Sequence, residues 1–72
     1  MELEDARRIS PRIVSVYKEL NSILNEIQEH TGEAEFKRYR HKFAVVMGEI
    51  AVEIMEPLFK EHPAVMPPEF KR

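Results

Sequence analysis

Residues 27–36 read Ile27-Gln28-Glu29-His30-Thr31-Gly32-Glu33-Ala34-Glu35-Phe36, and this stretch decides how the chain folds. It separates two long segments in which apolar residues recur at spacings of three and four, the pattern of one face of an α-helix. Gly32 is the residue that helices favour just past their C-terminus, because glycine tolerates left-handed backbone angles. The two glutamates that follow suit the positive end of a new helix dipole. A connection this short forces the two helices to fold back antiparallel.

The first predicted helix spans about residues 11–30. Ser10-Pro11 reads as an N-cap followed by proline at the first helical position, where its missing N–H costs nothing. Residues 2–9 are expected to form at most a frayed turn, because the Ser-Pro step should break helical continuity. The apolar stripe of this helix consists of Ile13, Val16, Tyr17, Leu20, Ile23, Leu24 and Ile27.

The second predicted helix spans about residues 33–56, after a turn at about 31–32, and Pro57 should end or kink it. Residues 62–72 are punctuated by prolines and are expected to form an extended tail. The predicted fold class is therefore all-α: one helical-hairpin domain over residues 1–72, which dimerises into a four-helix bundle. The stripe of the second helix consists of Phe36, Tyr39, Phe43, Val46, Met47, Ile50 and Ile54.

Charge gradients along the two helices are consistent with antiparallel pairing. Both helices are basic early and acidic late, which opposes their own dipoles. In a hairpin, Glu26 and Glu29 should lie beside Lys37 and Arg38. Arg12 should likewise lie beside Glu49 or Glu53, at the other end of the hairpin.

The second half of the second helix is apolar around roughly two-thirds of its circumference, more than one partner helix can cover. A soluble monomer avoids exposing such a surface, so the sequence predicts a homodimer. Gly48 would then let two backbones approach closely; the alternative is that it accommodates a bulky side chain of the first helix. The predicted dimer interface consists of Ala44, Val45, Gly48, Ala51, Val52, Met55, Leu58 and Phe59.

A run of basic residues gives the alternative function, a nucleic-acid-binding helical-hairpin dimer. The aromatics interleaved with it, Phe36, Tyr39 and Phe43, belong to the apolar stripe, and the net charge of −2 gives no general attraction to nucleic acid. The simpler interpretation of the run is a solvated charged face. The residues that would contact nucleic acid are Lys37, Arg38, Arg40, His41 and Lys42.

The tail offers a second kind of partner site. Residues 65–70, Val65-Met66-Pro67-Pro68-Glu69-Phe70, carry apolar side chains on a stiff segment that could dock on another protein. Such tails more often pack on their own bundle or stay mobile.

Composition argues against catalysis and cofactors. There is no cysteine, and the three histidines are too scattered for a ready-made metal site. No phosphate-binding loop, catalytic triad or repeated Glu-x-x-His pattern is present, so we expect neither an enzyme nor a cofactor. No apolar run approaches the length of a membrane span and no signal peptide is visible, so we expect a cytoplasmic protein without a membrane partner. The sequence thus predicts a small homodimeric interaction module, an adaptor or regulator.

Overall fold

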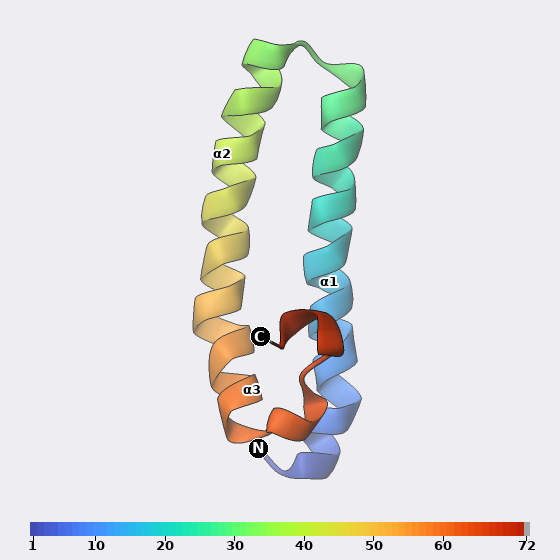
Figure 1. The fold of residues 1–72 in the computed structure, drawn as a ribbon, viewed down its shortest axis with the longest axis vertical. Helices are drawn as coiled ribbons and strands as arrows, with labels where there is room; N and C mark the ends of the chain where they lie inside the picture. The colour runs from blue at the N-terminus through green and yellow to red at the C-terminus, as the bar shows by residue number, and fades with distance from the viewer. Residues whose placement is uncertain (72) are drawn as a thin grey trace.

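The computed structural model describes residues 1–71, which are helical and contain no strand (Figure 1). Helix α1 spans Leu3–His30 and helix α2 spans Glu33–Ile50. A π-helical turn, η1, covers Ala51–Met55 and leads into the short helix α3, Glu56–Glu61. Two 3₁₀ turns, η2 at Pro63–Val65 and η3 at Pro68–Phe70, complete the chain.

Helices α1 and α2 form the antiparallel hairpin that the sequence predicts. The connection is as short as expected, because α1 ends at His30 and α2 begins at Glu33. The Thr31 hydroxyl closes α1 by donating a 2.7 Å hydrogen bond to the Ile27 carbonyl. Gly32 plays a different role from the predicted one: its φ of −73° is not left-handed, and it serves as the N-cap residue of α2.

The predicted start of the first helix is wrong. Helix α1 begins at Leu3 and continues through Pro11, which stands inside it. Glu4 and Asp5 lie in the first turn, where their charge favours the helix N-terminus. Ala6 and Ser10 are 0% and 1% exposed, so this added length is packed against the rest of the chain. That packing offsets the hydrogen bond that proline removes from a helix interior.

Pro57 alters the second helix without ending it. The Glu56 N–H bonds to the Ala51 carbonyl, five residues back, so the helix widens into η1 immediately before the proline. Backbone angles remain helical from Ile50 to Glu56, and α3 continues to Glu61. A π turn is one of the few ways in which a helix absorbs a local break in its bonding pattern.

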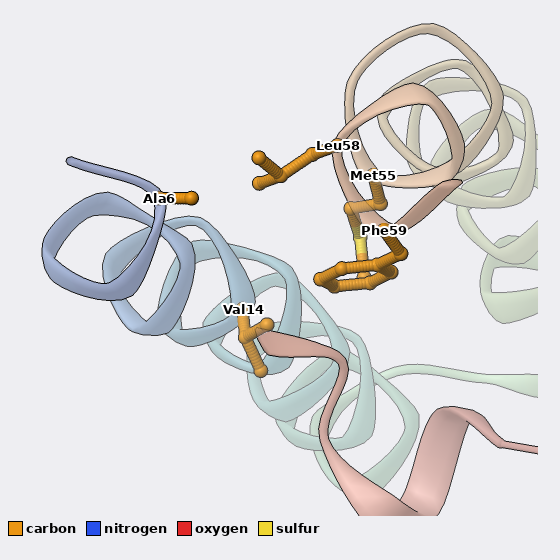
Figure 2. Close-up of a cluster of buried hydrophobic side chains, with 5 residues drawn as sticks. All are labelled: Ala6, Val14, Met55, Leu58 and Phe59. Carbon is orange, nitrogen blue, oxygen red and sulfur yellow. The ribbon is translucent and has the colours of Figure 1, made fainter. Parts of the chain in front are cut away.

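The hydrophobic core lies at the end of the hairpin far from the turn, and Figure 2 shows its five buried side chains. Met55, Leu58 and Phe59 project from η1 and α3 toward Ala6 and Val14 of α1. In contrast, none of the described side chains between residues 15 and 46 is buried. The rest of the hairpin therefore consists of two helices that touch along one line with nothing above or below them.

The tail is not extended as predicted, although Arg72 lies outside the described residues. Its two 3₁₀ turns fold it back across α1 (Figure 1). The Ser10 hydroxyl donates a 3.3 Å hydrogen bond to the Val65 carbonyl, and the Phe70 ring meets Tyr17 edge-on at 6.0 Å between centroids. Val65 and Met66 pack on the core as well. We call residues 63–70 the C-terminal segment, and the side of the hairpin that it covers the tail side.

Polar contacts also hold the N-terminus to the end of α3. The Met1 ammonium lies 2.9 Å from a Glu61 carboxylate oxygen, and His62 Nε2 donates to the Met1 carbonyl at 2.7 Å. The hydrogen bond and the charge of Glu61 raise the pKa of the Met1 amine, and the same contacts lower the pKa of the Glu61 carboxyl. Both groups thus favour their charged forms in the fold.

The predicted ion pairs across the hairpin do not form within this chain. Among residues 1–71, Glu26 and Glu29 make no pair with the basic residues of α2, and Arg12 makes none with its acidic residues. Lys37 instead lies 3.5 Å from Glu33, one turn away on its own helix.

A proline substitution tests the continuity of α1. We expect Pro11→Ala to raise the free energy of unfolding by about 1–2 kcal/mol, because alanine restores a bond to the Arg7 carbonyl and suits a helix interior. Chemical denaturation measures the change. If the helix began at Ser10, proline would stand at its preferred first position, and the substitution would leave stability unchanged or lower it.

Candidate functional site

No group of three or more metal-ligating side chains comes together within residues 1–71. Over the same range, none of the helices combines the length and apolar character needed to cross a membrane. The candidate sites are therefore surfaces: the predicted dimer interface, the basic run, the C-terminal segment and the remaining exposed apolar side chains.

Five of the eight predicted interface residues lie at the surface of α2 and η1. Val45 and Val52 are 54% and 55% exposed, Ala44 and Gly48 are exposed, and Ala51 is half-buried. They are brought together on one flank of the helix, as expected from their spacing. All five residues lie on α2 and η1, and none lies on α1.

The other three, Met55, Leu58 and Phe59, are already buried in the chain's own core. Their exposed fractions are 3%, 7% and 5%. In an uninterrupted α-helix, Phe59 would share a flank with Val45 and Val52, which precede it at intervals of seven residues. The wider π turn shifts the helical position of the residues after it by about one residue, roughly 100° around the axis. Met55, Leu58 and Phe59 are therefore turned inward.

Gly48 does not make room for a side chain of α1. A Cβ built on it would meet nothing within 4 Å. The packing explanation within the hairpin is therefore excluded, and a glycine that weakens its helix stands next to open space.

A second exposed apolar surface lies on the side of the hairpin opposite the tail side; we call it the open side. Val16 and Ile23 of α1 are 56% and 39% exposed, and Tyr39 and Val46 of α2 are 40% and 53% exposed. Val16 and Ile23 lie roughly 130° around α1 from the side chains that meet the C-terminal segment. Tyr39 and Val46 are displaced by a similar angle from Ala51, which lies near that segment. Because the helices are antiparallel, both displacements lead to the same side.

The sequence contained the signal for the open side. Ile9, Val16 and Ile23 follow one another at intervals of seven residues, as do Phe36, Phe43 and Ile50. Such heptad spacing is typical of helices that pack in bundles and coiled coils. The apolar stripes predicted for the two helices include most of these residues, but the prediction assigns them only to packing between those two helices.

The basic run does not converge on one face. All five predicted contact residues are exposed, but at 100° per residue they spread over roughly 200° of the circumference of α2. Lys42 lies over the Tyr39 ring at 5.9 Å, and Arg40 lies over the Phe36 ring at the same distance. The rings of Phe36, which precedes the run, and of Tyr39, which lies within it, are thus each partly covered by a cation.

The C-terminal segment forms one wall of a shallow groove of about 960 Å³ on the tail side. Met66 and Phe70 face Val52, Met55 and Tyr17 across it. Outside the groove, the Glu69 carboxylate pairs with the Lys18 ammonium. The hydrogen bond from Lys18 is the main cause that lowers the pKa of the Glu69 carboxyl. The segment predicted as a docking peptide thus packs on its own chain.

Neither a protein-family model nor a curated protein nor a solved structure matches this chain.

Substitution of Gly48 reports on what lies beside it. We expect Gly48→Ala to raise the free energy of unfolding by about 0.5–1 kcal/mol, because alanine favours the helix and its methyl group meets open space. Thermal or chemical unfolding measures the change. A loss of stability would mean that another chain occupies the space beside the glycine.

Acidification should loosen the C-terminal segment. The folded-state pKa of Glu69 is depressed, so its contact with Lys18 contributes fully above the free-segment value of about 4.3 and is lost as pH falls through the lower folded value. Because the Phe70 ring lies beside Tyr17, the Tyr17 ring protons follow the detachment by NMR. Glu69→Gln is the control: the variant should show the loosened state already at neutral pH and should lack the acid transition.

Proposed function

We propose that this chain is a small homodimeric protein-interaction module without catalytic activity, an adaptor or regulator in which two hairpins form a four-helix bundle. The observation that carries the proposal is the amount of surface that one chain leaves exposed. A folded monomer of 8.5 kDa is expected to expose about 4,650 Å². This chain exposes 5629 Å², an excess of nearly 1,000 Å².

The shape of the chain points the same way. Its radius of gyration is 14.4 Å, whereas a compact domain of 72 residues is expected near 11 Å. The elongation comes from the half of the hairpin nearer the turn, which has no buried side chain of its own. Small scaffolds without disulfides or metals commonly gain the missing core by self-association. The lack of cysteine also fits a reducing compartment, and we propose the cytoplasm.

Self-association is tested by the mass of the protein in solution. We expect sedimentation equilibrium at micromolar concentration to give about twice 8.5 kDa, because the second copy supplies the core that one hairpin lacks. Dilution should lower the melting temperature, since a dimer's stability depends on protein concentration. A monomer mass that persists at high micromolar concentration would contradict the proposal.

A parallel measurement separates this function from nucleic-acid binding. Heparin resin should retain the protein weakly at near-physiological salt, since the basic run is spread around α2. Strong retention that Arg38→Ala with Arg40→Ala abolishes would favour the nucleic-acid-binding dimer instead.

A further inference from the structure

The open side carries apolar residues from both helices along the whole hairpin. On α1 they form two neighbouring series with seven-residue spacing. The first consists of Ile9, Val16 and Ile23, and the second consists of Ile13, Leu20 and Ile27. On α2 the heptad series of Phe36, Phe43 and Ile50 lies next to Tyr39 and Val46. In each helix this stripe is centred between the neighbouring helix and the open side. A helix of a four-helix bundle points its stripe in that diagonal direction, because it packs on two neighbours at once.

The tail side cannot receive a second hairpin in the same way. The C-terminal segment stands on it and covers α1 near the core (Figure 1). Nearer the turn, α1 presents Asn21, Asn25 and Gln28 toward that side, all of them exposed. The small-residue flank of α2 and η1 therefore has no apolar continuation on α1, whereas the open side is apolar on both helices.

The open side is also large enough for a stable interface. The chain measures 45 by 21 by 17 Å along its principal axes, so a hairpin laid lengthwise on its twin can cover a face of roughly 900 Å². Specific interfaces bury about 800 Å² on each partner. The excess exposed surface of the single chain is of the same size.

Charged residues border the stripe in a pattern that one chain cannot satisfy. Arg12 and Glu19 flank it on α1, and Lys42, Glu49 and Glu53 flank it on α2. These borders are the two outer edges of the open side, so they cannot meet within one hairpin, and none of the five forms an ion pair with the others.

A second copy brings these edges together. Counted back equally from the turn, Glu19 is level with Ala44 and Arg12 is level with Ala51. When α1 of one copy lies over α2 of the other, with both turns at the same end, Glu19 comes beside Lys42. Arg12 then falls between Glu49 and Glu53, about 3 Å along the axis from each. Charges at such flanking positions set partner choice and orientation in helical bundles.

We propose that two copies of this chain pair through the open side, about a two-fold axis along the hairpin, so that α1 of each copy packs beside α2 of the other. This deepens the proposed function and rests on it, because it assigns the face and the orientation of the homodimer. It moves the interface from the predicted small-residue flank to the side on which both helices are apolar.

Four valines with nearly equal exposure provide a matched test of the face. Val16 and Val46 lie on the open side, Val45 and Val52 lie outside it, and all four are 53–56% exposed in the single chain. A lysine at any of them is equally tolerable for an isolated hairpin, because lysine favours helices and its charge can reach water. We expect Val16→Lys and Val46→Lys each to raise the dimer dissociation constant at least tenfold, and Val45→Lys and Val52→Lys to change it less than threefold.

Sedimentation gives the dissociation constants, and circular dichroism checks that every variant remains helical. If Val45→Lys and Val52→Lys separate the copies while the open-side variants do not, the proposed face is wrong and the homodimer stands. If the unmodified protein is a monomer, the proposed function fails together with this inference.

A charge exchange between two variants tests the orientation. In Glu19→Lys, lysine of each copy faces Lys42 of the other, and in Lys42→Glu, two glutamates face each other, so both homodimers should weaken. Mixed together, each chain supplies the charge that the other lacks at both contacts. We expect the heterodimer to exceed its statistical half of the population, by native mass spectrometry at low salt, and to approach one half as salt screens the charges.

A statistical mixture at low salt would overturn the proposed axis. The other two-fold arrangement, with the axis across the hairpin, sets α1 beside α1 and offers Glu19 no Lys42 of the second copy. A pairing within one chain gives no preference on mixing either.

Discussion

Two helices lying side by side enclose no interior, and this constraint governs where the chain can bury side chains. Each helix touches the other along one line, so a stripe wider than that line remains in contact with solvent. Burial becomes complete only where a third layer arrives. In this chain the third layer is the C-terminal segment, whose Val65, Met66 and Phe70 pack on the core, and the buried residues of α1 and α3 therefore lie at that end of the hairpin. The remainder of the hairpin has apolar stripes but no layer to cover them.

The sequence predicts the hairpin well because its determinants are local. The Gly32 turn and the spacing of apolar residues define both helices without reference to distant parts of the chain. The predicted helix start at Ser10-Pro11 is wrong for the opposite reason. The Ser-Pro step follows a local preference, and the packing of Ala6 and Ser10 against segments more than fifty residues away overrides it. Tertiary burial outweighs propensity at such positions.

The surfaces were harder to predict than the helices. A helical wheel assumes one constant rotation per residue, and the π turn violates that assumption just before Leu58 and Phe59. Pro57 indicates that the helix is disturbed, but the sequence does not show in which direction the residues after it rotate. It therefore does not predict that Leu58 and Phe59 turn inward. The charged residues are complementary, as the sequence predicts, but not within one chain. Arg12 and Glu49 have opposite charges, and a single hairpin places them on opposite edges.

The π turn at Ala51–Met55 has a consequence for how this chain can change in length. Because of this turn, side chains on the two sides of it point in directions that an uninterrupted helix would not give. Val46, before the turn, points away from the C-terminal segment, and Phe59, after it, points into the core. The helical phase of the apolar pattern therefore shifts at this turn. An insertion or deletion of a single residue there would exchange outward and inward positions for all of α3, whereas the same change in the Thr31–Gly32 loop would alter only a connection. Related chains should thus keep the residue count between Ile50 and Glu56 fixed even where the residues themselves differ.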